Sequence, residues 1–238
     1  MPFQTSVNPY PAPGLEGGWA SANPHFSRLT PGNGDPAVST YSAWVAGALG
    51  VIVGRFAFGN TATGVVSSVH PGVATTVVGF VHRDHPVVIT TWLGSTSMVV
   101  TSGLEIDLMD SADVWARFAA GATVGQKVFA SYADGSAIAG TAGSPPTATG
   151  VTVTTTSGSP NLTAVAGGTL VPGQPVSGTG IPAGAFIVTA SGTTATLSAN
   201  ATASGTGVAL TQTTAIETRW TVDSPAAAND IAKISTRG

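Results

Sequence analysis

One long segment of the chain carries no charged side chain, and this limits how it can fold. From Gly135 to Ile216 there is no Asp, Glu, Lys or Arg, and Thr, Gly, Ala and Ser dominate. Disordered segments usually combine high charge with few β-branched residues, whereas this one is rich in Val and Thr. We therefore favour a small folded β-module over low-complexity disorder. Its short strands are expected at 150–156, 178–182, 185–190, 194–198 and 208–211.

The stretches on either side of this segment resemble strands that belong together. Apolar residues occupy alternate positions over 124–132, interrupted only by Phe129, and lead into an Asp134-Gly135 turn. This pattern predicts the first arm of a β-hairpin. The uncharged segment that follows shows no pattern of a return arm. Charged, strand-like sequence resumes only at 217–222. We interpret this as a final hairpin opened to admit a second module, so the strands around Val128 and Val222 should pair.

The chain then divides into an extended N-terminal arm, a β-barrel or β-sandwich body, and an inserted β-sandwich-like module. The predicted ranges are 1–40 for the arm, 41–146 plus 213–238 for the body, and 147–212 for the module. Strand-like runs recur about every ten residues in the body, as in antiparallel barrels and sandwiches. They occur at 39–58, 72–82, 87–92, 97–101 and 104–108. Only Asp110 to Ala120, with Asp113 as a cap, is expected to be helical, for a turn or two.

The arm is defined by its prolines and glycines, which prevent a regular helix or central strand. Composition alone is equally compatible with a flexible linker. However, the arm also carries Phe3, Tyr10, Trp19 and Phe26, and solvated linkers seldom hold so many aromatic side chains. We therefore expect an arm that docks on a surface.

Composition excludes several classes of function. Only 8% of the residues are charged, the net charge is −3 and the 8 Lys and Arg are scattered, so no basic stripe for nucleic acid is present. The longest apolar stretch, 43–58, is interrupted by Gly and Arg and falls short of the ~20 residues that span a bilayer. No signal-peptide pattern opens the chain, and we expect a soluble product made in the host cytoplasm. The chain has no Cys, which removes disulfides and thiolate catalysis.

No pattern of side chains predicts catalysis, a metal or a cofactor. The tetrad His82-Arg83-Asp84-His85 lacks the companion motifs of a kinase and is interpreted as a polar turn. An acidic cluster lacks the spacing of a calcium loop and is interpreted as a solvated edge or a subunit contact. Its members are Glu105, Asp107, Asp110 and Asp113.

Two portions of the sequence resemble structural cement proteins of tailed bacteriophages. The N-terminal portion comprises Pro11-Ala12-Pro13-Gly14 through Ala22-Asn23-Pro24, followed by 51–57; the C-terminal one comprises 122–130 with the Asp134-Gly135 turn, 217–220 and 230–235. Separately, 176–184 with 195–198 resembles small β-modules that recur in phage virion and tail proteins.

The resemblance implies a protein on the outside of an icosahedral capsid that bridges major capsid protein subunits, without catalysis or cofactor. Self-association as a dimer or trimer is expected, since symmetric copies would cover apolar strand faces. Trp19 and Phe26 would be buried anchors. The residues expected to contact the capsid or another subunit are Tyr10, Trp19, Asn23, Pro24, Phe26, Trp44 and Arg55.

Two other functions stay open. In a head-fibre or receptor-binding protein, the uncharged module would project outward and contact host surface glycans. In a β-rich lectin or glycan-active enzyme, paired carboxylates would be needed, and only Glu105, Asp107 and Asp110 could supply them.

Overall fold

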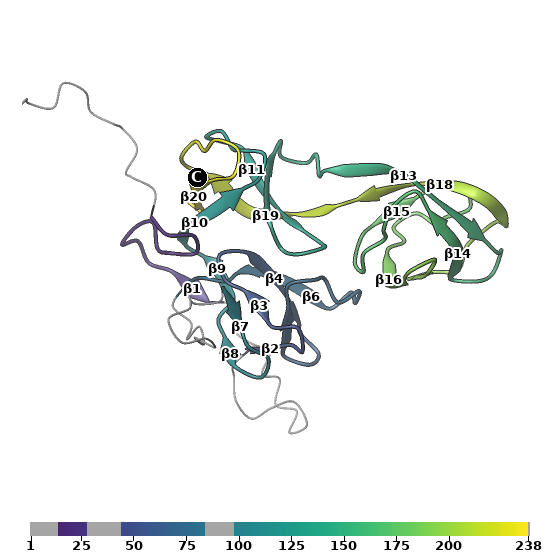
Figure 1. The fold of residues 1–238 in the computed structure, drawn as a ribbon, viewed down its shortest axis with the longest axis horizontal. Coiled ribbons are helices and arrows are strands. Elements are labelled where there is room, and N and C mark those ends of the chain that lie inside the picture. Colours follow the sequence, from purple (N-terminus) through teal and green to yellow (C-terminus); the bar gives the residue numbers. More distant parts are fainter. Residues whose placement is uncertain (1–13, 28–43, 84–97, 238) are drawn as a thin grey trace, which may run out of the picture.

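The computed structural model describes residues 14–27, 44–83 and 98–237, and in these ranges the chain forms twenty β-strands and no helix (Figure 1). The all-β expectation is confirmed. The strands form a seven-stranded sheet, a closed barrel, a six-stranded sheet and a two-stranded ribbon. Nothing in the described ranges could cross a membrane as a helix.

The seven-stranded sheet, here the first sheet, is built from the N-terminal half of the described chain. Its spatial order is β1-β9-β6-β4-β5-β2-β8. The strand bounds are Phe26–Ser27 (β1), Trp44–Ala46 (β2), Phe56–Asn60 (β4), Val65–Ser67 (β5), Thr76–Phe80 (β6), Glu105–Ile106 (β8) and Met109–Ser111 (β9). Beside it, Val51–Ile52 (β3) pairs with Val99–Val100 (β7). The single strand expected over 51–58 is therefore divided between β3 and β4, and the strand expected at 87–92 lies outside the described residues.

The barrel closes in the order β10-β12-β11-β19-β20. Its strands are Asp113–Phe118 (β10), Lys127–Ser131 (β11), Ala137–Gly140 (β12), Ala215–Val222 (β19) and Asp230–Ser235 (β20). The helix expected from Asp110 to Ala120 is wrong. Val114, Ala116 and Phe118 alternate into the core, while the intervening Trp115 is covered by Gly14. Both faces of β10 are thus largely buried, which hides the period of two that would have marked a strand.

A return arm follows the Asp134-Gly135 turn directly, contrary to the expectation that it is missing there. It is β12, which pairs with β11 from Lys127↔Gly140 to Ala130↔Ala137. Its sequence is Ala-Ile-Ala-Gly, and it was overlooked because it shares the composition of the uncharged segment. β19 pairs with the other edge of β11, with Lys127 opposite Thr221 and Phe129 opposite Glu217. The expected pairing of the strands around Val128 and Val222 is therefore confirmed.

The six-stranded sheet has the order β15-β18-β13-β14-β17-β16. Its strands are Thr147–Thr155 (β13), Asn161–Ala166 (β14), Val176–Ser177 (β15), Ile187–Ser191 (β16), Thr194–Leu197 (β17) and Gly205–Thr213 (β18). A bridge between Pro175 and Phe186 joins its two ends. The strand expected at 178–182 is absent, and a turn at Thr179 and Gly180 lies there instead. In Figure 1 the long strands β13 and β18 run out of the barrel and carry the rest of this sheet away from it.

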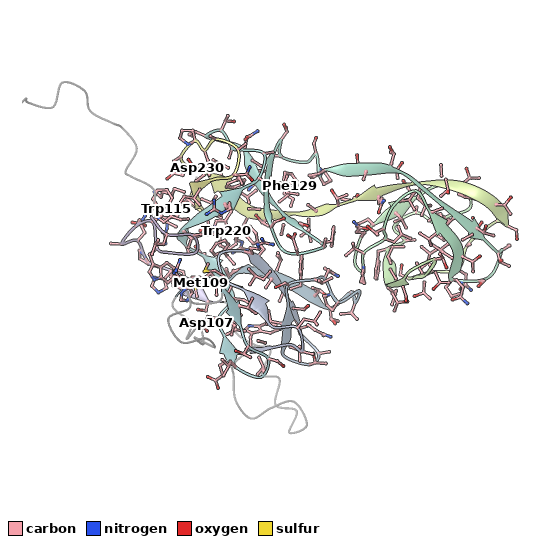
Figure 2. All side chains as sticks on the ribbon, viewed as in Figure 1. Asp107, Met109, Trp115, Phe129, Trp220 and Asp230 are labelled. Carbon is pink, nitrogen blue, oxygen red and sulfur yellow. The ribbon has the colours of Figure 1, made fainter. Side chains whose placement is uncertain are left out.

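One hydrophobic core is shared by the first sheet and the barrel, a second lies within the first sheet and its β3–β7 ribbon, and the six-stranded sheet has a core of its own. Trp220 lies on β19 (Figure 2). Its ring meets Phe56 of β4 edge-on at 5.4 Å between ring centroids, and Phe56 meets Phe80 in the same way at 5.3 Å. Edge-to-face aromatic pairs add about 0.5–1.5 kcal/mol each beyond burial. The six-stranded sheet buries mainly aliphatic side chains, including Leu162, Ile187 and Leu210.

Removing residues 147–213 should leave the remaining chain folded. Thr214 N donates to Pro146 O at 2.8 Å, so the two ends are already adjacent and a short Gly linker can close the gap. A single cooperative thermal transition with native near-ultraviolet circular dichroism is expected, because the shared aromatic core is retained. An unfolded product would contradict the division of the chain into a body and a module.

Candidate functional site

The N-terminal segment Gly14–Ser27 is attached to the first strand of the barrel. Gly17 N donates to Trp115 O at 2.8 Å, Trp115 N to Gly18 O at 3.0 Å, and Ala20 N to Asp113 O at 2.9 Å. Gly17 has a φ of 79°, and a Cβ there would lie 3.0 Å from the Gly54 backbone. The glycine lets the segment pass close to the first sheet, so both the barrel and the sheet hold it.

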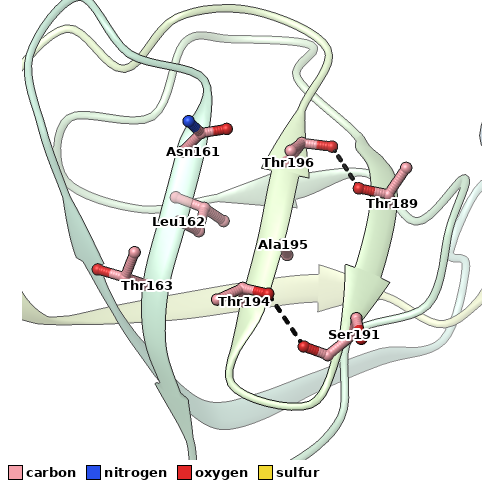
Figure 3. A pocket seen from close by; sticks show the side chains of 8 residues that line it. All are labelled: Asn161, Leu162, Thr163, Thr189, Ser191, Thr194, Ala195 and Thr196. Carbon is pink, nitrogen blue, oxygen red and sulfur yellow. Dashed lines mark hydrogen bonds between the residues drawn. The ribbon is translucent and has the colours of Figure 1, made fainter.

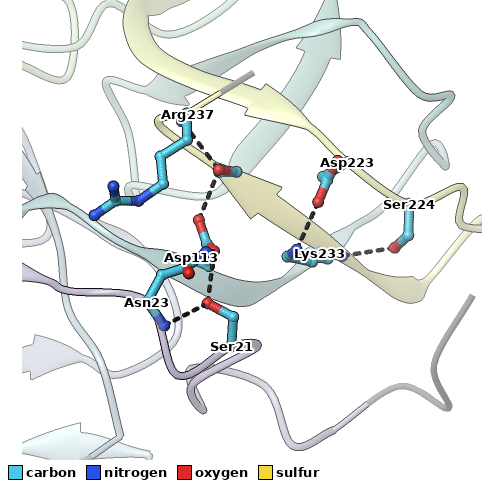
Figure 4. A network of polar contacts seen from close by, with 8 residues as sticks. Ser21, Asn23, Asp113, Asp223, Ser224, Lys233 and Arg237 are labelled. Atoms are coloured by element: carbon cyan, nitrogen blue, oxygen red, sulfur yellow. Dashed lines mark hydrogen bonds and ion pairs between the residues drawn. The ribbon is translucent and has the colours of Figure 1, made fainter.

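Asp113 is the polar centre of this attachment (Figure 4). Its Oδ2 accepts hydrogen bonds from Ser21 Oγ and Asn23 Nδ2, both at 2.6 Å, and its Oδ1 accepts one from Ser235 Oγ at 2.6 Å. Burial by itself raises the pKa of Asp113, but the bonds from Ser21, Ser235 and Asn23, with the Lys233 charge, lower it overall. One ionised carboxylate thus joins the N-terminal segment, β10 and the C-terminal strand β20.

Two further contacts hold the segment at its ends. Arg117 Nε donates to Glu16 Oε2 at 2.7 Å, and an Arg237 guanidinium nitrogen donates to Pro24 O. The pair between Arg117 and Glu16 lies near the surface, so it contributes only about 0–1 kcal/mol. The backbone and Asp113 contacts therefore dominate.

The segment exposes two large apolar side chains. Leu15 is 65% exposed and Phe26 is 61% exposed. Trp19 stacks on His25 at 4.1 Å between ring centroids and meets His82 in a tilted arrangement at 4.6 Å. Beside Trp19 lies a groove of about 340 Å³, lined by Leu15, Gly17, Gly18, Trp19 and Arg83. We call the exposed side chains of Leu15 and Phe26, with this groove, the N-terminal face.

The structure brings four of the seven expected contact residues together. Trp19, Asn23, Pro24 and Phe26 all lie on this segment, and the last three are exposed. Asn23 and Pro24 are also used internally, by Asp113 and Arg237. Tyr10 lies outside the described residues.

The other two expected contact residues lie elsewhere. Arg55 pairs with Asp134 at 2.6 Å, where the first sheet meets the barrel. Trp44 is 2% exposed and packs in the core of the first sheet, so its side chain does not form part of a surface. The sequence did not predict Leu15 or Arg83 as part of this surface. The one available signal was the group of glycines around Leu15, because glycines allow a segment to lie close to a neighbouring strand.

The described members of the polar clusters considered for chemistry have structural partners of other kinds. His82 is 5% exposed and meets Trp19, while Asp84 and His85 lie outside the described residues. Asp110 pairs with Arg219 at 2.7 Å, and Asp113 holds the N-terminal segment. Among the described residues, no three His, Asp or Glu side chains are grouped as metal ligands would be.

A second concave surface lies on the six-stranded sheet (Figure 3). Its volume is about 280 Å³, and its outward side chains are neutral hydroxyls and an amide. Thr189 and Thr196 hydroxyls bond at 2.6 Å, and Thr194 Oγ1 donates to Ser191 O at 3.0 Å. The lining residues are Asn161, Leu162, Thr163, Thr189, Ser191, Thr194, Ala195 and Thr196. Such a surface can form hydrogen bonds with neutral polar groups.

Replacing Asp113 by Ala should destabilise the protein by about 2–4 kcal/mol, because the buried Ser235 hydroxyl and two partly buried hydrogen bonds, from Ser21 and Asn23, lose a charged acceptor. The pKa of Asp113 is lowered by folding, so its stabilisation is present above the pKa of the unfolded chain, ~3.9, and is lost as pH falls below it. Denaturant unfolding at neutral and acid pH measures both effects.

The exposed Glu105→Ala variant is the control and should change the free energy of unfolding by less than about 0.5 kcal/mol. If Asp113→Ala lowers the free energy of unfolding by the same amount at neutral and at acid pH, the ionised network of Asp113 would be contradicted.

A search of curated proteins found no match to this chain. A family model described as XM1 gp53 minor capsid protein matches residues 3–166. This range covers the N-terminal segment, the first sheet, the barrel strands β10 to β12 and the strands β13 and β14. It is more than half of the 238 residues. The chain therefore belongs to the XM1 gp53 minor capsid protein family and is a phage structural protein of the virion.

Proposed function

We propose that the protein binds the outer surface of an icosahedral phage capsid through its N-terminal face and stabilises the capsid by bridging major capsid protein subunits. The observation that carries this proposal is an apolar face on a backbone that is already fixed. Leu15 and Phe26 are exposed, yet their segment is hydrogen-bonded to β10 and held by Asp113. A preorganised face loses little conformational entropy on binding.

The energetics suit a protein that acts in many copies. Complete burial of a Leu or Phe side chain contributes about 1.5–3 kcal/mol. A molecule that binds only the assembled lattice stabilises it by its binding free energy, and this term is added at every occupied site. Modest affinity per copy is sufficient when one molecule touches two subunits. Self-association as a dimer or trimer would extend the bridge further.

In this proposal the body comprises residues 41–146 and 213–238, and 147–212 is an inserted module that is not needed for capsid binding. The shared core of the first sheet and the barrel supports a single body. The separate core of the six-stranded sheet supports a module that folds on its own.

A second candidate function concerns the module alone. The neutral hydroxyl surface on β14, β16 and β17 favours contact with uncharged polar ligands such as host surface glycans. The body would then anchor a receptor-binding module to the particle. Phage particles assembled with a protein lacking residues 147–213 distinguish capsid stabilisation from receptor binding, when both capsid stability and adsorption to the host are measured. Loss of adsorption with intact capsids would support the second role, while loss of capsid stability would count against it.

The double substitution Leu15→Glu and Phe26→Glu should weaken binding to particles that lack this protein by at least about 100-fold. The two lost burials amount to about 3 kcal/mol or more, and each 1.4 kcal/mol is a factor of ten. Co-sedimentation of the purified protein with such particles measures the affinity, and thermal release of the packaged genome measures the stabilisation.

Val124→Glu is the matched control, since Val124 is a 52% exposed apolar side chain elsewhere on the body. It should bind as the parent does. Equal binding by the double variant and the parent would refute the assignment of the N-terminal face.

A further inference from the structure

The module meets the body at a second place besides its connecting strands. There, His70 of the first-sheet region is 9% exposed and lies between Phe58, at 5.0 Å, and Tyr132, at 5.3 Å between ring centroids. His70 N donates to Tyr132 O at 3.0 Å, and His70 Nδ1 accepts from Gly72 N at 3.1 Å. The imidazole is thus fixed in one orientation, with no freedom to turn aside.

Two glycines let the module approach this imidazole. A Cβ on Gly173 of the module would lie 1.9 Å from His70 Nδ1. A Cβ on Gly72 of the body would lie 2.1 Å from Val188 O and 3.1 Å from Pro172 Cβ of the module. Distances of 1.9 and 2.1 Å are far below van der Waals contact. The Gly173 backbone therefore lies directly on the His70 ring, the Gly72 backbone lies directly on Val188, and neither glycine position has space for a side chain.

The connection at the base of the module is less tightly packed. Only β13 and β18 join the module to the barrel, and their register shifts between Ala148 and Val151. Gly150, at φ 102°, lies in this irregular stretch. Beside it is a cavity of about 370 Å³, lined from the barrel side by Ser131, Ala133 and Thr214 and from the module by residues including Gly167 and Gln212. The module therefore does not pack flush against the barrel at its base.

We propose that His70 and Gly72 of the body, with Gly173 and Val188 of the module, form a latch that holds the module against the body, and that the module swings on β13 and β18 when the latch opens. The inference rests on the proposed division into body and module, and it is independent of capsid binding. It gives the module two positions relative to any surface to which the body is bound.

Protonation of His70 opens this latch. Burial lowers the pKa of His70 to about 4. Of the groups around it, Phe58 is apolar, Tyr132 has its pKa raised by burial, and the module has no charged side chain. No carboxylate of these elements compensates a charge on the ring. Opening returns the imidazole to water and to a pKa of 6.5, so the closed state is favoured above that value and loses its advantage as pH falls toward 4.

Distance measurements between two spin labels test the latch in the full chain. The chain has no Cys, so Ser102→Cys on the body and Thr206→Cys on the module, both at exposed positions, can be labelled selectively. The parent should give one narrow distance distribution. Gly72→Ala and Gly173→Ala should broaden it or add a second distance, because the new methyl groups cannot fit.

Matched controls remove the effect of backbone strain. Gly64 and Gly184 have φ values of 69° and 77°, close to those of Gly72 and Gly173, but a Cβ on either meets nothing within 4 Å. Gly64→Ala and Gly184→Ala should keep the narrow distribution. Latch variants that keep the parent distribution, or controls that broaden it equally, would overturn the proposal.

The pH dependence of the latch is measured with the same spin labels. Between about pH 7.5 and about pH 5, the ratio of open to closed molecules should rise on the order of thirty-fold in the parent, given pKa values of about 4 closed and 6.5 open. His70→Asn keeps an acceptor near Gly72 N but does not titrate, so its ratio should stay constant. A parent that does not respond, or an Asn variant that responds equally, would refute the role of His70. Since no capsid is present, these outcomes leave the particle-binding test unaffected.

Discussion

The attachment of the N-terminal segment depends on the ionised carboxylate of Asp113. It lies on the first barrel strand and binds Ser21 and Asn23 on one side and Ser235 on the other, so residues more than two hundred positions apart meet at one group. Only 8% of the residues are charged, and several of the described ones form ion pairs or hydrogen bonds between segments far apart in the sequence. Arg117 with Glu16, Arg55 with Asp134 and Arg219 with Asp110 repeat the same use. The N-terminal face is held in place mainly by the Asp113 carboxylate and by backbone hydrogen bonds to β10.

The body and the module are stabilised by different means. Aromatic side chains from the first sheet and the barrel interlock, so these two units share one core and neither is expected to fold without the other. The module buries aliphatic side chains and is solvated by Ser and Thr hydroxyls on its surface. It therefore needs no charged side chains to stay hydrated. In the proposed division, the body carries the binding face, and the module, joined to it through two strands and one contact, can change independently.

Sequence reasoning identified the all-β class and the pairing of β11 with β19, because both follow from alternation and from the break in charge. It failed where burial on both faces removed the alternation, as in β10, and where β12 took on the composition of the uncharged segment. Trp44 was expected at a contact but is a core residue, since a lone Trp in a short strand does not indicate which side is covered. The latch around His70 has no signature in sequence, because it depends on two glycines brought together from separate sheets. Membership of the minor capsid family came from the comparison rather than from any single site residue.

We propose that this chain covers a capsid lattice. Quantitative mass spectrometry of purified particles gives the number of copies of this chain per major capsid protein. The account predicts a ratio near one or a simple fraction such as about one third, since a bridging protein occupies equivalent lattice positions. A handful of copies per particle would contradict it and would assign the protein to a single vertex or to the tail.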